Sequence, residues 1–468
     1  MLLSENKDVF ERFLKFTAHP ELSTESASEY LVTLFQSMGL QPSAQPVIHS
    51  YDYVAKRQYN VIGVLGDKLV DRTTPKGLLF VSPFDSLEPA GEPVYARLAL
   101  WCALEAVQSF REKPLKQPVY IATTCGSAIH DLGTRYLVSS KSLFPNHVIV
   151  GAMTDNKIEV ANKSLHRITL TLDQASTKKD ARGFSRGLKL SCKGLKVSSA
   201  FPKSGVNAIH ELMDYLLDSA EHGFELKIDS IAAGGRYSLV PDQASATFFL
   251  TPHQFEDYRK AFEEQNRADQ DGRALLSLEP TQSTPHVFME EDLRNCSEEI
   301  RLKLQAFSLL LSKVKDEQFN PPHPTLVLTE LVAKGSQARL RFDLRLLPDQ
   351  NAEEVIRSLL QDLKNITLKY PRLNAKFARD QSLGAYGYLQ SEFTDIAKEL
   401  AGEAGLSAKW EYASLANETS LFKQANYKTL GFGPGSLHKP LKLDRPELVE
   451  AMQFSTHFYE LMIERLCL

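Results

Sequence analysis

The sequence predicts an α/β protein: a mostly parallel sheet flanked by helices, with an inserted α+β domain of two similar sheet-plus-helix units. Three observations support this fold class. In the first part of the chain, short strands that are apolar on both faces alternate with helices. Half-exposed strands with alternating apolar and polar residues follow from about Ser164. From about Tyr386 the chain again shows helices and a buried strand. At 468 residues the chain is also too long for one ordinary core.

The first part of the chain, residues 1–163, contains predicted helices and buried strands in alternation. A helix is expected from Ser26, which forms a capping box with Glu29, to Gly39, where a C-terminal stop is expected. A second helix is expected over residues 96–113, with Trp101 and Leu104 packed in the core. Runs rich in β-branched and apolar residues predict strands over residues 60–65, 77–81, 118–124 and 146–152.

Residues 164–379 alternate apolar and polar side chains, as half-exposed antiparallel strands do. Strands are expected over residues 164–173, 187–194, 224–233 and 244–250, with a helix over 206–220. A polar helical stretch, about residues 255–314, precedes strands over 325–333 and 338–348, a helix over 351–363 with an Asn351/Glu354 capping box, and a strand over 374–380. Two units, about 164–254 and 318–379, therefore suggest a duplicated small domain.

The last part, residues 380–468, returns to helices and a buried strand. Helices are expected over residues 393–405 and 447–466, and a strand over 428–434. The inserted α+β domain thus interrupts an α/β domain made of residues 1–163 and 380–468.

Composition excludes several classes of function. The chain is 43% hydrophobic and 24% charged, and its net charge of −4 gives no electrostatic reason to expect nucleic acid. No apolar run approaches the roughly 20 residues that span a bilayer, and charges near the N-terminus argue against an export signal. Five cysteines without C-x-x-C spacing fit a reducing compartment, so we expect a cytoplasmic protein.

Four short motifs occur in an informative order: GVNAIHEL (205–212), AAGGRYSLVP (232–241), FDLRLLP (342–348) and LGFGPGS (430–436). With the domain order, they make nearly the whole chain resemble the zinc-dependent peptidases and deacylases related to acetylornithine deacetylase, carboxypeptidase G, aminoacylase and aminoacyl-histidine dipeptidase. The dipeptidase branch, in which one chain supplies two lid units, is the most similar. The resemblance implies that the inserted α+β domain is a lid.

The resemblance also implies where a co-catalytic zinc pair would be held, and this chain departs from the family at each position. Such a pair needs imidazole and carboxylate ligands, a bridging carboxylate and a glutamate base. The ligand positions fall at Pro83, Tyr95 (the bridge), Ala128, Ala152 and Leu441 or Lys442, and the base at Ser127. Proline, alanine and leucine side chains have no donor atom, so we expect no zinc and no other cofactor.

Four residues remain as candidates for binding a ligand: Asp85, Gly235, Ser238 and Arg345. Asp85 is the one family residue retained beside the lost ligands, although it could simply cap its turn. By resemblance, Arg345 stands where the family meets a substrate carboxylate; it could also pair with Asp343 or face solvent. Ser238 replaces a family asparagine, and Gly234 and Gly235 could serve only a backbone turn.

The position of the family's lid histidine falls near Val197, so that group is lost as well. Two alternative sites stay open. Cys125, with His130 five residues later, could form a nucleophile and base. Asp85, His130, Asp155 and His438 could instead rebuild a metal site from shifted positions.

These observations favour a peptidase-fold pseudoenzyme that lacks the metal site and binds a small carboxylate-bearing ligand or a protein partner. The alternatives are a divergent metal- or thiol-dependent hydrolase and a structural or assembly protein. We expect neither nucleic acid nor a membrane as a partner, and the double lid is compatible with a monomer or a homodimer.

Overall fold

The computed structural model describes residue 11 and residues 24–47, 58–66, 76–84, 94–126, 131–175, 183–235, 238–268, 275–281, 288–387, 391–406, 409–435 and 446–468. The chain divides into two compact units. The α/β unit comprises Met1–Lys163 and Leu383–Leu468, and the lid unit comprises Ser164–Ser382.

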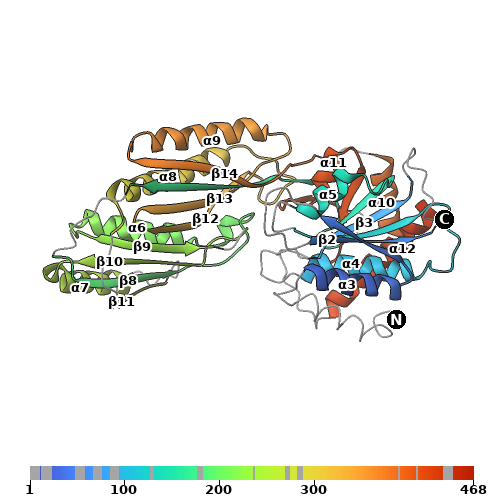
Figure 1. The fold of residues 1–468 in the computed structure, drawn as a ribbon, viewed down its shortest axis with the longest axis horizontal. Coiled ribbons are helices and arrows are strands. Elements are labelled where there is room, and N and C mark those ends of the chain that lie inside the picture. Colours follow the sequence, from blue (N-terminus) through green and yellow to red (C-terminus); the bar gives the residue numbers. More distant parts are fainter. Residues whose placement is uncertain are drawn as a thin grey trace. The chain divides into compact units, whose positions relative to one another are not determined.

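The α/β unit is built on a sheet with the strand order β1-β2-β4-β3-β5-β16-β6-β15 (Figure 1). These strands are β1 (Gln41–Val47), β2 (Gln58–Leu65), β3 (Leu78–Pro83), β4 (Val119–Thr124), β5 (His147–Gly151), β6 (Ile158–Asn162), β15 (Trp410–Ala413) and β16 (Lys428–Phe432). The four central strands β4, β3, β5 and β16 run parallel, whereas β1, β2 and β6 join their neighbours β2, β4 and β16 in antiparallel pairs. The predicted α/β fold with parallel strands is therefore confirmed at the centre of the sheet.

Helices cover both faces of this sheet, which explains why its strands are apolar throughout. One face packs against α3 (Thr24–Ser37), α4 (Val94–Gln108), α10 (Glu392–Glu403) and α12 (Pro446–Cys467). The other face packs against α5 (Leu132–Ser140) and α11 (Thr419–Gln424). Trp101 and Leu104 of α4 are fully buried, as the sequence predicts.

Some predicted boundaries in this unit were wrong. Helix α3 begins at Thr24, so Ser26 and Glu29 lie inside the helix and are not its cap. Gly39 does end the helix, with a positive φ of 86° and its amide donating to Gln36 O. The sequence analysis missed α5, α11, β1, β6 and β15.

The lid unit contains a second sheet, with the strand order β11-β8-β10-β9-β12-β13-β7-β14. Its strands are β7 (Leu165–Gln174), β8 (Arg186–Lys193), β9 (Lys227–Gly234), β10 (Gln243–Leu250), β11 (Leu275–Pro280), β12 (Thr325–Lys334), β13 (Gln337–Arg345) and β14 (Leu373–Leu383). Figure 1 shows the helices α6 (Ala208–Glu221), α7 (Pro252–Ala268), α8 (Glu291–Leu311) and α9 (Ala352–Thr367) beside this sheet. Side chains of all four helices join those of the sheet in one apolar core.

The predicted sheet-plus-helix composition is confirmed, with two differences. β7 comes first in the chain but pairs between β13 and β14, so it lies in the second half of the sheet. β11 interrupts the stretch expected to be helical, and it pairs with β8. The predicted cap of α9 is present, since the Asn351 side chain accepts a 3.4 Å hydrogen bond from the Glu354 amide.

No helix in the described part of the chain is both long and apolar enough to cross a membrane.

Candidate functional site

The carboxyl ends of the parallel strands β3, β4, β5 and β16 meet at one edge of the α/β sheet, where open α/β sheets usually bind ligands. Pro83 ends β3 and lies opposite Thr124 at the end of β4. Ala152 follows β5 directly, and its amide donates a 3.2 Å hydrogen bond to Phe432 O at the end of β16. Both Pro83 and Ala152 are buried, and neither side chain has an atom that could ligate a metal.

Arg97 places a positive charge beside this edge. It belongs to α4 and is 6% exposed, and its Nε donates a 2.7 Å hydrogen bond to the carbonyl of Phe84, the residue after Pro83. A guanidinium stays protonated at every physiological pH, so Arg97 cannot itself ligate a metal ion.

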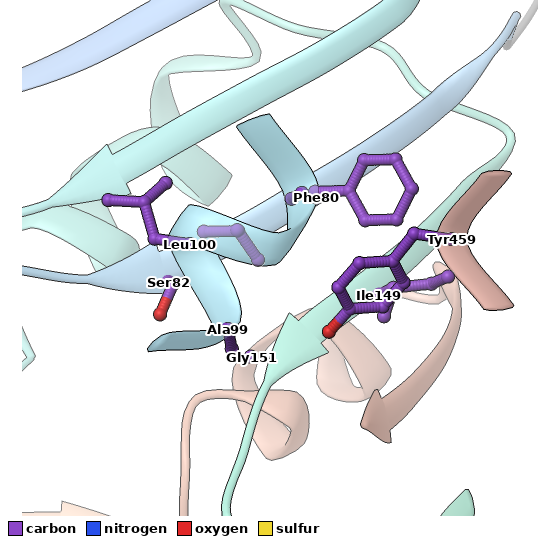
Figure 2. A pocket seen from close by; sticks show the side chains of 9 residues that line it. Phe80, Ser82, Ala99, Leu100, Ile149, Gly151 and Tyr459 are labelled. Atoms are coloured by element: carbon purple, nitrogen blue, oxygen red, sulfur yellow. The ribbon is translucent and has the colours of Figure 1, made fainter. Parts of the chain in front are cut away.

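The space behind the edge is packed with apolar side chains. Between β3, β5, α4 and α12 there is a void of about 10 Å³, lined by Phe80, Leu100, Ile149 and Tyr459 among others (Figure 2). The rings of Phe80 and Tyr459 lie 4.9 Å apart, and the Tyr459 hydroxyl donates to Phe432 O. A void of this size holds at most one water molecule.

Several predicted site residues lie outside the described residues: Asp85, Ser127, Ala128, His130, His438, Leu441 and Lys442. The backbone of Tyr95 lies in the first turn of α4.

Pro83 and Ala152, the described residues at this edge, do not fit a co-catalytic zinc pair. Zinc requires imidazole, thiolate or carboxylate ligands in a convergent set. Within the described ranges, no three His, Cys, Asp or Glu side chains gather closely enough to hold a metal ion. The described positions Pro83 and Ala152 offer no donor, and Arg97 adds a cation.

At the alternative site, the described contacts of Cys125 are with Asn60. Cys125 is 1% exposed, and its amide and thiol both donate to Oδ1 of Asn60, at 3.2 and 3.6 Å. The Asn60 side chain also donates to the Gly133 carbonyl at 2.9 Å, so it joins β2 and β4 to the start of α5.

Asp155 is the one member of the proposed shifted metal site that the structure describes. It is exposed, has a positive φ of 54°, and its amide donates a 2.7 Å hydrogen bond to Gly435 O.

In the lid unit, a buried polar cluster surrounds Asp343 of β13. Oδ1 of Asp343 accepts a 3.2 Å hydrogen bond from Arg167 Nε, and Oδ2 accepts one of 2.8 Å from the Ser199 hydroxyl. Arg167 also donates to the Ser238 hydroxyl at 2.9 Å and to Gln381 Oε1 at 2.6 Å. Asp343 therefore pairs with Arg167 of β7, its cross-strand neighbour, and makes no hydrogen bond to Arg345.

Arg345 is the unusual member of this cluster. It is 1% exposed, so the expectation that it could face solvent was wrong. Its Nη2 lies 3.4 Å from the Ser199 hydroxyl, whereas Nε and Nη1 are buried without a hydrogen-bond partner. Burial lowers the pKa of Arg345 to about 10, and the positive charge of Arg167 adds to this shift while Asp343 opposes it. Unpaired buried N–H groups are rare and destabilising, which marks this guanidinium as a candidate anion-binding group.

The other lid candidates differ in their relation to Arg345. Ser238, at a positive φ of 58°, belongs to the same cluster through Arg167. Gly235 has a positive φ of 110°, and a Cβ built on it would lie 3.9 Å from Oε2 of Glu330. Gly234 has a backbone role: its φ is 77°, and a Cβ there would lie 2.0 Å from Thr329 O. Val197 O accepts from the Val240 amide.

Sequence reasoning missed Arg167, Ser199 and Gln381. The alternation in residues 164–173 places Arg167 on the opposite face of the strand from the apolar Ile168, Leu170 and Leu172. The sequence therefore indicated that this strand has a polar face. Its contact with Asp343 depends on the pairing of β7 with β13, which no local pattern specifies.

With the fold and site described, comparison with known proteins is informative. Residues 181–269 match the sequence model of the M20 peptidase dimerisation domain. The aminoacylhistidine dipeptidase of Vibrio alginolyticus aligns over 97% of this chain and 95% of its own, at 13% identity and a TM-score of 0.56. Human carnosine dipeptidase 1 aligns over 98% and 97%, at 11% identity and a TM-score of 0.55. Dug1p, a dipeptidase of Saccharomyces cerevisiae, aligns over 99% and 97%, at 11% identity and a TM-score of 0.54. No curated protein matches the sequence.

The predicted resemblance to the zinc peptidase and deacylase family is thereby confirmed. The likeness at 11 to 13% identity concerns the fold alone.

Proposed function

We propose that this chain, which has the fold of the M20 dipeptidases, is a pseudoenzyme that needs no metal and binds a small carboxylate-bearing ligand through its lid unit. The observation that carries the proposal is the lack of metal-ligating side chains among the described residues at the edge of the α/β sheet. Pro83 and Ala152 cannot ligate a metal, and the Arg97 guanidinium lies at the same turn. A hydrolase of altered specificity would retain its metal ligands, because the attacking water depends on them.

Arg345 supports the binding half of the proposal. The Arg345 guanidinium carries a positive charge in a buried site, and its Nε and Nη1 have no hydrogen-bond partner. A ligand carboxylate accepting from Nε and Nη1 of Arg345 would supply the missing partner and offset that charge. Because Arg345 is buried, the ligand reaches it only when covering segments separate, and we expect association slower than diffusion.

A thermal-shift titration of the full chain tests this binding. N-acetylglycine is the probe, and N-acetylglycinamide, which lacks the negative charge, is the matched control ligand. We expect a concentration-dependent rise in melting temperature with the acid alone, lost in Arg345→Met and kept in Arg372→Met, which changes an exposed arginine of the same unit. An equal response to acid and amide, or a response that survives in R345M, would refute carboxylate binding at this site.

All five cysteines lie in the described part of the chain, where they are buried and form no disulfide, which supports our proposal that the protein works in the cytoplasm.

A further inference from the structure

A pocket of about 480 Å³ opens in the lid unit beside the first turns of α6. Its volume is within the range of roughly 300 to 1,000 Å³ that is typical of small-molecule sites. The turn before α6, the helices α6 and α8 and the start of β12 contribute to its lining, among others with Val206, Gln305, Leu326 and Val327. The described residues of this lining differ from those of the Arg345 cluster.

The pocket lies where β12 has a neighbouring strand on one side only. On that side β12 pairs with β13 from its first residue, Thr325, to its last, Lys334. On the other side its pairing with β9 starts only at Glu330. Residues 325–329 therefore have no strand beside them on the β9 side within the described part of the sheet.

The backbone N–H and C=O of Leu326 point toward this open side. Beyond the end of β13, the Ser164 amide donates a 2.9 Å hydrogen bond to Leu346 O, so the even-numbered residues there face β7. Successive residues of a strand point their backbone groups to alternate sides, so Asp343 faces β12 and bonds to Val327, its cross-strand partner. Leu326, the residue before Val327, therefore points away from β13.

These two backbone groups of Leu326 lack the partner that their neighbour has. The carbonyl of Leu328, which points to the same side, accepts a 2.9 Å hydrogen bond from the Asn207 side chain. For the N–H and C=O of Leu326, the described residues supply no such hydrogen bond, although Leu326 is only 6% exposed. Buried backbone polar groups are nearly always paired, so this pair indicates that a ligand completes it.

The side chains of the lining show that the pocket follows the edge of the strand. Leu326 and Val327 are adjacent in β12, so their side chains lie on opposite faces of the sheet. Leu326 belongs to the apolar core beside α6, whereas Val327 lies on the face of Asp343. Both nevertheless line the pocket, so it gives access to the strand's edge and to a part of each face.

We infer that this pocket binds a short peptide in an extended conformation, which adds to the edge of β12 and exchanges two hydrogen bonds with the backbone of Leu326. A peptide N–H donates to Leu326 O, and a peptide C=O accepts from the Leu326 N–H, as between two strands. Side chains of the peptide that point to alternate faces pack against the apolar lining. The inference does not involve the proposed carboxylate site at Arg345, so either can fail alone.

The test is calorimetric titration of the full chain with N-acetyl-Ala-Val-Ala-amide, which is blocked at both ends and carries no carboxylate for Arg345. We expect saturable binding with a Kd below about 1 mM. The control ligand is the same peptide with its three residue nitrogens methylated. It cannot donate to Leu326 O from these nitrogens and should bind at least tenfold more weakly.

Two matched variants locate the binding. Val206→Trp fills the pocket from its half-buried rim and should abolish binding. Val332→Trp makes the same change outside the pocket, at a side chain of β12 that is 37% exposed, and should leave the Kd unchanged.

The comparison of the two peptides uses the unchanged protein, so it stays valid even if V206W fails to fold. The inference would be overturned by any of three results: no binding of the parent peptide, equal affinity for the methylated peptide, or a folded V206W that binds as tightly as the wild type. Equal weakening by V332W would also overturn it.

Discussion

The hydroxyl of Tyr386 donates a 2.9 Å hydrogen bond to Oε1 of Glu159, a carboxyl group in β6 that is 1% exposed. The Asn417 side chain donates to both oxygens of the same carboxyl, at 3.0 and 2.8 Å. Glu159 thereby joins β6 to two segments of the α/β unit that are distant in sequence, since 227 residues separate it from Tyr386 and 258 from Asn417. Burial raises its pKa to about 8, although the hydrogen bonds from Tyr386 and Asn417 oppose the shift.

The first prediction concerns the pH dependence of stability through Glu159. Its pKa is higher in the folded than in the unfolded protein, so the folded state binds the proton more tightly. The free energy of unfolding should therefore fall as pH rises from about 4.5 to about 8, by on the order of a few kcal/mol from this group.

Glu159→Gln cannot ionise and should lack that fall. Urea unfolding at pH 5 and pH 8.5 measures the free energy of unfolding of both proteins. The free energy of unfolding of E159Q minus that of the wild type should be larger at pH 8.5 than at pH 5. Glu403→Gln, an exposed change at the end of α10, is the control and should show no such trend. A difference between E159Q and wild type that does not change with pH would show that the native carboxyl is already ionised at pH 5.

The second prediction separates binding from stability in the Asp343 cluster. Arg345→Met removes a buried cation with unpaired N–H groups, so the melting temperature should stay the same or rise. Asp343→Asn leaves the buried Arg167 without its paired carboxylate and should destabilise the protein by about 3 kcal/mol. Thermal or urea unfolding of both variants checks the opposite signs, and an R345M variant as unstable as D343N would mean that Arg345 has a structural role.

The third prediction concerns the close approach of Gly234 to β12. Gly234 and Gly223 both have positive φ, 77° and 88°, but only Gly234 faces another strand closely. Gly234→Ala would drive a Cβ to 2.0 Å from Thr329 O and should destabilise by at least about 3 kcal/mol. Gly223→Ala has nothing within 4 Å and should lose only about 1 kcal/mol, from backbone strain. Equal losses by urea unfolding would contradict the steric explanation.

Much of the fold could be predicted because its central strands and amphipathic helices carry strong local patterns. The edge strand β1 was not predicted because it contains Pro42 and Pro46, which argue against a strand. Proline cannot donate a backbone hydrogen bond and is tolerated in sheets mainly at edge strands. Strand β11 was not predicted because it is a short edge strand that follows a polar helix and ends at Pro280.

The candidate site was predictable in one respect and unpredictable in another. That Pro83 and Ala152 cannot ligate a metal follows from their side chains alone. The pairing of Arg167 with Asp343 joins residues 176 apart in sequence, and it follows only from the register of β7 on β13. In this register the Asp343 carboxylate pairs with Arg167 and not with Arg345. Two N–H groups of Arg345 therefore have no hydrogen-bond partner.

The most direct test of the central claim is the metal content of the purified full chain after loading with zinc or manganese and removal of free ions, measured by elemental mass spectrometry. Because the described strand ends lack ligands, we predict less than about a tenth of an equivalent of either metal. One or two tightly held ions per chain, together with hydrolysis of dipeptides or acylated amino acids, would contradict the proposal and identify the protein as a working hydrolase.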